Sequence, residues 1–240
     1  MIRRRGSRTL PRHLVVTAAL LLGSTALADV APAVVSAESA ATDPATAPRP
    51  AVPTPLPFVI GDDPLADDAQ QAIIAWSSFI LNDDRRAFNR FVNLRNSVAT
   101  AAALRLKLDP VVLQAAWGNA DSTHQLALLS AFSQLGVPYV HNTMRPGIAF
   151  DCSGLTAYAW AQVGRPMAHQ SLRQITAVQR VARQQAQAGD IVWYPGHVML
   201  YLGVGDAIIH APLSGRNVEV GFIAARRSRW VRFGNPVVDA

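Results

Sequence analysis

Cys152 is the single cysteine among the 240 residues, and it stands in the segment 150–155, which reads F-D-C-S-G-L. Asp151 is a good helix N-cap, and the apolar residues after Cys152 recur at helical spacing, so Cys152 is predicted in the first turn of a helix. There the backbone N–H groups and the macrodipole favour the thiolate, which attacks carbonyl carbon, and the Cys152 N–H is a candidate oxyanion donor. An inert core thiol is the alternative interpretation.

Two histidines could supply the base that such a thiol needs. His197 opens a predicted strand, and His210 closes another. An imidazole, with an unperturbed pKa of about 6.5, can take the proton of the thiol and return it to a leaving amine. An antiparallel return of the chain would place His210 beside His197, where it can orient that ring. The same three side chains could instead bind zinc, but a cysteine at a helix start favours a nucleophile.

Helices are predicted before these histidines, and short strands around them. Apolar residues at helical spacing run through 64–117, interrupted at Asp109-Pro110, and again through 123–135. Short apolar runs between glycine-containing turns predict four strands, at 191–194, 197–203, 207–210 and 217–222. The expected architecture is α+β, with helices packed on one face of a small antiparallel sheet. The nucleophile would lie where the two halves meet.

The first residues have the features of an export signal. Five arginines fall in the first twelve positions, and an apolar run at 14–22 and the triplet Ala26-Leu27-Ala28 follow. Residues 1–28 are therefore expected to be a cleaved signal peptide; a membrane anchor is the alternative, but the run is shorter than the about 20 residues that cross a bilayer. Without those arginines, 17 basic residues face 16 acidic ones, which removes the main support for nucleic-acid binding.

Composition divides the remaining chain into three parts. Residues 29–63 are rich in proline and alanine, which is typical of a linker that does not fold alone. Residues 64–122 form a helical N-terminal segment, which could cover the site and inhibit it. Residues 123–240 would form the catalytic domain. We expect a monomer without a cofactor, secreted or held in the cell wall, with no stable membrane span after signal removal.

Five blocks in the C-terminal half resemble a known family. In order, they read G-V-P-Y at 136–139, F-D-C-S-G-L at 150–155, G-D at 189–190, H-V-M-L-Y-L-G at 197–203 and I-H-A-P at 209–212. Together they resemble the NlpC-type papain-like endopeptidases of bacterial peptidoglycan. The resemblance, which spans Leu128 to Val220, implies a papain-like fold. It also implies cleavage of the wall stem peptide, between D-glutamate and a diamino acid such as meso-diaminopimelate.

The same resemblance implies a role for each polar residue near the cysteine. Cys152 would be the nucleophile, His197 the general base and His210 the orienting group. Tyr139 would line the oxyanion site. The candidate substrate contacts are Asp151, Ser153, Ser171 and His141.

Two departures from the family pattern keep other functions open. After Tyr139 the family usually has an aromatic residue and two glycines, whereas this chain has V-H-N-T at 140–143. The turn between His197 and His210 is also one residue longer than usual. A wall-binding module without turnover is one alternative. An amidase or an acyl transferase with the same nucleophile is another.

Outside the motifs, the remaining histidines and a basic cluster invite simpler interpretations. His124 and His169 are expected at the surface. The C-terminal arginines lie close together and could contact anionic wall polymers, although solvated surface is the commoner role of such clusters; they are Arg226, Arg227, Arg229 and Arg232.

Overall fold

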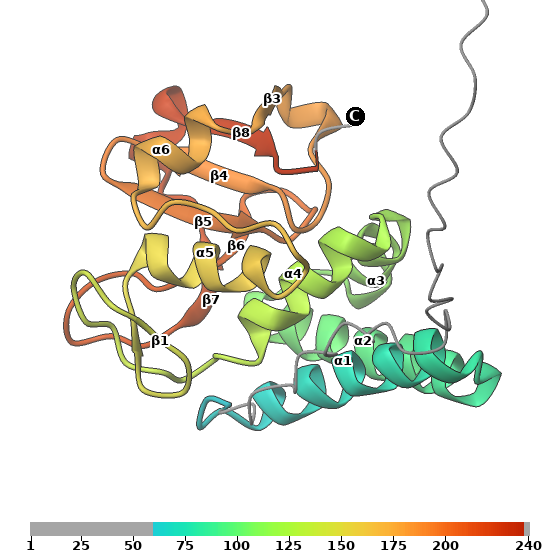
Figure 1. Cartoon of the computed structure of the whole chain (residues 1–240). Helices are drawn as coiled ribbons and strands as arrows, with labels where there is room; N and C mark the ends of the chain where they lie inside the picture. Colours follow the sequence, from blue (N-terminus) through green and yellow to red (C-terminus); the bar gives the residue numbers. More distant parts are fainter. Residues whose placement is uncertain (1–59, 238–240) are drawn as a thin grey trace, which may run out of the picture. The chain divides into compact units, whose positions relative to one another are not determined.

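The computed structural model describes residues 60–237, and Figure 1 shows their helices and strands. The predicted signal peptide and the linker up to residue 59 lie outside the described residues. The helices are α1 (Pro64–Asn82), α2 (Arg85–Leu106), α3 (Pro110–Asn119), α4 (Ser122–Phe132), α5 (Cys152–Ala161) and α6 (Ser171–Thr176). Two 3₁₀ turns are η2 (Arg183–Gln185) and η3 (Ala225–Trp230). In the part of the chain that the structure describes, no helix has the length and apolar character needed to span a bilayer.

The first four helices each begin after an aspartate. The side chain of this residue accepts a hydrogen bond from a backbone N–H of the first turn, which satisfies a donor that the helix itself cannot; the four caps are Asp63, Asp84, Asp109 and Asp121. Proline occupies the first position of α1 and of α3, where its missing N–H costs no hydrogen bond. The interruption predicted at Asp109-Pro110 is confirmed: α2 ends before it, and α3 begins at Pro110, one residue before the helix start expected at Val111.

The main sheet has six strands in the order β3-β8-β4-β5-β6-β7, and every neighbouring pair is antiparallel. The strands are β3 (Gln179–Val181), β4 (Ile191–Tyr194), β5 (His197–Tyr201), β6 (Ala207–His210), β7 (Glu219–Phe222) and β8 (Arg232–Asn235). A separate pair, β1 (Met144–Arg145) and β2 (Ala149–Phe150), precedes α5. The α+β prediction is confirmed, and β4 and β6 have the predicted bounds. Strands β3 and β8 were not predicted, because they lack apolar alternation.

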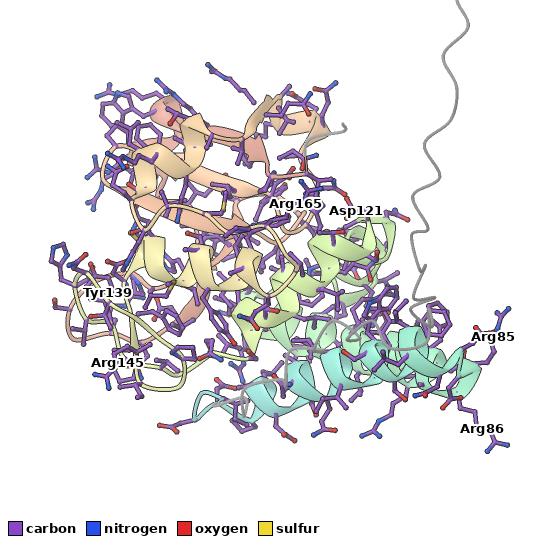
Figure 2. The ribbon with its side chains drawn as sticks, in the orientation of Figure 1. Arg85, Arg86, Asp121, Tyr139, Arg145 and Arg165 are labelled. Atoms are coloured by element: carbon purple, nitrogen blue, oxygen red, sulfur yellow. The ribbon has the colours of Figure 1, made fainter. Side chains whose placement is uncertain are left out.

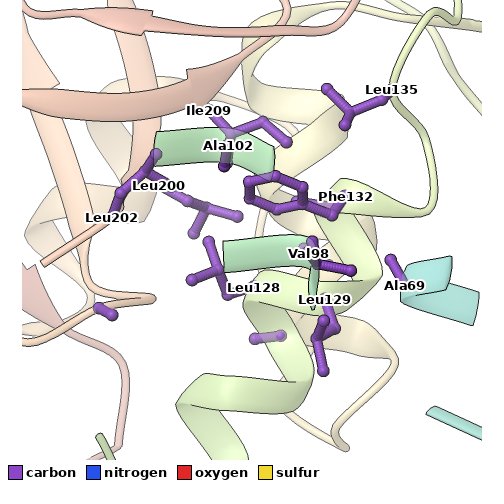
Figure 3. Packing of buried hydrophobic residues seen from close by; sticks show 14 of the residues in the cluster. Ala69, Val98, Ala102, Leu128, Leu129, Phe132, Leu135, Leu200, Leu202 and Ile209 are labelled. Carbon is purple, nitrogen blue, oxygen red and sulfur yellow. The ribbon is translucent and has the colours of Figure 1, made fainter. Parts of the chain in front are cut away.

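One hydrophobic core joins the helices to one face of the sheet. Figure 3 shows Phe132 and Leu128 of α4 between Val98 of α2 and the sheet residues Leu200 and Ile209, and all are fully buried. The core continues into α1 and α3, where the indole N–H of Trp117 donates to the carbonyl of Leu202 at 3.1 Å. The segment 64–122 and the sheet therefore share one core.

The other face of the sheet is also covered. A second cluster gathers Met199 and Tyr201 of β5 with Val192 and with Phe233 of β8. The rings of Tyr201 and Phe233 meet edge to face, with centroids 5.2 Å apart. All five residues of β5 are consequently buried, which fixes the position of His197 at the start of this strand.

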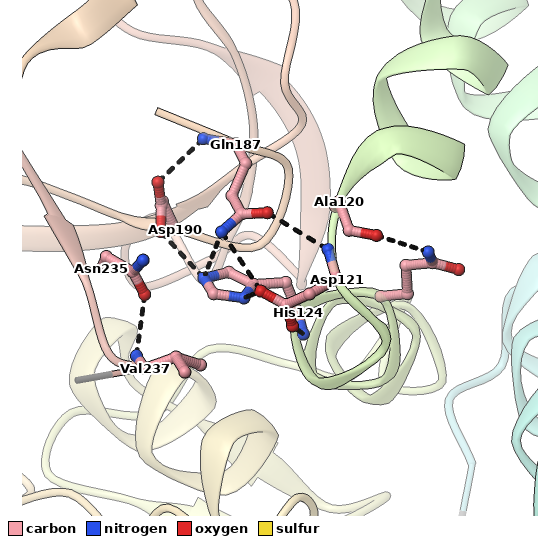
Figure 4. Close-up of polar contacts among 8 residues, drawn as sticks. Ala120, Asp121, His124, Gln187, Asp190, Asn235 and Val237 are labelled. Carbon is pink, nitrogen blue, oxygen red and sulfur yellow. Dashed lines mark hydrogen bonds and ion pairs between the residues drawn. The ribbon is translucent and has the colours of Figure 1, made fainter. Parts of the chain in front are cut away.

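A buried polar cluster ties α4 to the turn before β4 (Figure 4). The ring of His124 is fully buried, with Nε2 3.0 Å from an oxygen of Asp190 and Nδ1 2.6 Å from an oxygen of Asp121. Gln187 donates its backbone N–H to Asp190 at 2.8 Å. The prediction of a surface His124 is wrong: Asp190, 66 positions further along the chain, provides the polar partner that allows this imidazole to be buried.

Candidate active site

One buried carboxylate organises the first turn of α5. Asp151 is the N-cap, and its Oδ1 accepts hydrogen bonds from the Gly154 N–H at 2.6 Å and from the Ser153 hydroxyl at 3.0 Å. The Nε2 of His169 lies 2.9 Å from the same oxygen. The prediction that Asp151 caps a helix starting at Cys152 is confirmed. His169, which was expected at the surface, is partly buried because of this contact.

The glycine of the D-C-S-G block is required by a close backbone approach. The carbonyl oxygen of Thr143 accepts the Asp151 N–H at 2.8 Å and lies over Gly154. A Cβ at Gly154 would be 2.3 Å from that oxygen and 3.0 Å from His169 Nε2. The loop 140–143, which departs from the family pattern, therefore packs closely against the first turn of the helix that begins at Cys152.

Gly154→Ala is expected to destabilise the protein, although alanine favours helices. The added methyl group has to displace a backbone carbonyl, and overpacking of this kind costs about 1–3 kcal/mol. Gly118→Ala in α3 is the matched control, because only the flexible side chain of Arg95 lies near it, at 3.4 Å. Denaturant unfolding of both variants measures the difference. An unchanged midpoint for Gly154→Ala would contradict the close packing of the loop on α5.

The Cys152 thiol is partly buried, and two opposing effects act on it. Burial raises its pKa, while the backbone N–H groups of Val198, Ser153 and Cys152 itself lower it. Burial is the larger effect, so the sulfur is protonated at rest. The sequence predicts a thiolate from the helix position alone, whereas the burial of the sulfur acts in the opposite direction. The contribution of Val198, the residue after His197, shows that the sulfur lies at the start of β5.

His197 and His210 meet across neighbouring strands. The Nε2 of His197 is 2.9 Å from the Nδ1 of His210, and the two ring centroids are 5.1 Å apart. Burial lowers the pKa of His197 to about 4. Burial, the neighbouring His197 and Arg216 lower the pKa of His210 to about 3. Both rings are therefore neutral at neutral pH, and Nδ1 of His197 is the nitrogen that His210 leaves free.

A carboxylate continues this line of contacts. Glu219 is the register partner of His210 on β7, and its Oε1 lies 3.7 Å from His210 Nε2. Arg216 forms an ion pair with the same oxygen. The sequence reasoning missed Glu219, although its place directly opposite His210 in a predicted hairpin could have indicated it.

Tyr139 lies close to the cysteine through its backbone. It forms a parallel bridge with Phe150, two residues before Cys152, and its N–H donates to the carbonyl of Arg216 at 2.9 Å. Burial, followed by the charges of Cys152 and Asp151, raises the pKa of the phenol. Figure 2 shows Tyr139 at the end of the molecule opposite Arg85 and Arg86 of α2.

The candidate substrate contacts have different surroundings. Ser153 is buried and donates to Asp151, which itself is 6 % exposed. Ser171 opens α6 and is partly exposed, and His141 is exposed in the loop after Tyr139. Within residues 60–237, no three His, Cys, Asp or Glu side chains are grouped so as to hold a metal ion.

Residues 136–231 match the model of the NlpC/P60 family. The C-terminal part of the chain thus carries an NlpC/P60 domain. A probable endopeptidase of Corynebacterium glutamicum strain R is 37 % identical over 132 residues, covering 52 % of this chain and 62 % of the relative. The peptidoglycan endopeptidase RipA of Mycolicibacterium smegmatis is 36 % identical over 104 residues, covering 37 % of this chain and 21 % of RipA. The chain thus spans less than two thirds of the length of either relative.

Solved NlpC/P60 domains are also similar to this chain. The NlpC/p60 domain of the peptidoglycan hydrolase SagA is 33 % identical, with a TM-score of 0.40, and the match covers 47 % of this chain and 98 % of that domain. RipD of Mycobacterium tuberculosis, described as a non-catalytic NlpC/p60 domain protein, is 25 % identical, with a TM-score of 0.39; the match covers 48 % of this chain and 98 % of RipD. The predicted family resemblance and papain-like fold are confirmed.

Proposed function

We propose that this chain is an exported cysteine endopeptidase that hydrolyses the bond between D-glutamate and the diamino acid of the peptidoglycan stem peptide. The observation that carries the proposal is the 2.9 Å contact between His197 and His210 beside the helix start that holds Cys152. The similar proteins of Corynebacterium glutamicum and Mycolicibacterium smegmatis are named as endopeptidases, which supports the same reaction class. Export through residues 1–28 and action in the wall as a monomer belong to this proposal.

The neutral resting pair determines how the nucleophile is activated. The proposed reaction uses the tautomer of His197 that is protonated on Nε2, so that Nε2 can donate to His210 Nδ1, 2.9 Å away, and Nδ1 of His197 is free to accept a proton. As the sulfur of Cys152 bonds to the substrate carbonyl carbon, its proton passes to that nitrogen. The imidazolium that forms is stabilised through His210 by Glu219.

The remaining steps use the same groups. The Cys152 N–H and the Tyr139 hydroxyl donate to the oxyanion of the tetrahedral intermediate. When the C–N bond breaks, His197 gives its proton to the departing amine, and a thioester remains. Water then loses a proton to His197 and attacks the thioester carbon, which releases the acid and restores the thiol.

Mass analysis of muropeptides incubated with the protein tests the proposal. Cleavage is expected to give a peptide with a new amine on the diamino acid and a fragment that ends in D-glutamate. Binding of the muropeptide without new amines would instead support the wall-binding module. Cleavage of a different amide bond would support the amidase. Transfer of the acyl group to an added amine would support the acyl transferase.

A further inference from the structure

A cluster of aromatic and basic side chains lies next to His197. Tyr194 is the register partner of His197 at the end of β4, and the two ring centroids are 5.4 Å apart. The guanidinium carbon of Arg227, in η3, lies 5.4 Å from the centre of the Tyr194 ring and 5.9 Å from that of Trp230. These three residues, Tyr194, Arg227 and Trp230, form what we call the η3 cluster.

Tyr194 connects the η3 cluster to the candidate active site. Burial raises the pKa of the Tyr194 phenol; Arg227 lowers it, the thiolate form of Cys152 raises it, and Arg226 lowers it. The Tyr194 ring contacts both the His197 ring and the Arg227 guanidinium, so Arg227 belongs to the surroundings of the site. It is also the partly buried arginine of η3, whereas Arg226 and Arg229 are exposed.

Arg227 contacts the rings of Tyr194 and Trp230 through its guanidinium. No ion pair among residues 60–237 includes it. A guanidinium that stacks on aromatic rings keeps its planar N–H edges available, and their fork geometry matches a carboxylate. The arrangement fits an anionic group that comes from a bound ligand.

The reaction geometry indicates which part of the substrate this would be. His197 has to deliver its proton to the leaving amine, so side chains that contact its ring flank the leaving-group half of the substrate. In the proposed substrate the leaving amine belongs to the diamino acid. When that residue is meso-diaminopimelate, its side chain ends in a free carboxylate.

We propose that Arg227 binds the free side-chain carboxylate of the diamino acid, and that Tyr194 and Trp230 pack on its aliphatic chain. This subsite rests on the proposed function and specifies its substrate class: stem peptides with an unamidated meso-diaminopimelate. Charge-assisted hydrogen bonds to such a carboxylate correspond to roughly 10- to 100-fold in specificity.

Paired tetrapeptides that differ only in this group test the subsite. One contains meso-diaminopimelate, and the other contains its side-chain amide. The wild-type protein is expected to cleave the acid with a kcat/KM roughly 10- to 100-fold above that of the amide, and Arg227→Gln to bring this ratio close to one. Arg86→Gln, a remote exposed arginine on α2 (Figure 2), is the matched control and should retain the ratio. A ratio unaffected by Arg227→Gln would overturn the subsite.

Binding to inactive protein separates this inference from the proposed function. Calorimetry with Cys152→Ala is expected to show tighter binding of the acid peptide than of the amide, and Cys152→Ala/Arg227→Gln to lose the difference. Binding that depends on Arg227 without any cleavage by the wild type would contradict the proposed function alone. Cleavage without dependence on Arg227 would contradict the subsite alone. Arg227→Lys keeps the charge but not the fork, so an intermediate ratio excludes a folding defect as the cause.

Discussion

Cys152→Ala is expected to abolish the cleavage of muropeptides, with a fall in kcat/KM on the order of 10⁴-fold or more. In the proposed reaction the sulfur forms the bond to the substrate, and alanine offers no group to replace it. The residual rate would come only from substrate binding and oxyanion donors. The measurement is the initial rate of new amine formation, followed by mass analysis.

The structure provides a check on this result. Cys152 is only partly buried, and the cap of its helix is made by Asp151, so alanine leaves the first turn of α5 in place. The variant should therefore unfold at about the same denaturant concentration as the wild type, and should still bind the muropeptide. Undiminished cleavage by a folded Cys152→Ala protein would refute the cysteine mechanism.

His197→Ala is expected to lower kcat/KM by about 10²- to 10⁴-fold, and His210→Ala by a smaller factor. His197 is proposed to transfer the proton itself, whereas His210 is proposed to orient the His197 ring through the 2.9 Å contact between His210 Nδ1 and His197 Nε2. The double variant should therefore be no slower than His197→Ala alone, because His210 has no role once its partner is gone. Steady-state rates of the three variants on one muropeptide measure this relation.

A pH profile extends the same test. Since burial lowers the pKa of His197 to about 4, its ring is neutral and can accept a proton throughout the range above that value. The wild-type kcat/KM should accordingly fall only as the pH approaches 4, and not near the ordinary histidine value of about 6.5.

For the histidine variants, independent and multiplying effects of the two substitutions on kcat/KM would contradict the positioning role of His210.

Local signals in the sequence were sufficient to place Cys152 at a helix start and to predict much of the sheet. The N-cap Asp151 and the turns around β4 and β6 are encoded within a few residues, and the predicted positions agree with the structure. Strand β8 was missed because its sequence, R-F-G-N, becomes a strand only through its pairing with β3 and β4.

Contacts between distant segments were beyond prediction from one sequence. The burial of His124 depends on Asp190, and that of His169 on Asp151, 18 positions earlier. The protonated resting state of Cys152 results from burial, which no motif reveals, and this effect exceeds that of the nearby N–H groups. Tyr194 was predicted as an ordinary strand residue, and its contact with Arg227 depends on the fold of η3.

The core that α1, α2 and α3 share with the sheet limits how this chain could be regulated. Val98 and Trp117 pack in the same interior as Leu200, within the strand that His197 begins, and Leu202, which directly follows that strand. Removal of these helices would expose that interior to water and loosen β5. Cleavage between α3 and α4 followed by release of the three helices would therefore destabilise the half that contains Cys152, so these helices are poorly suited to be a detachable propeptide.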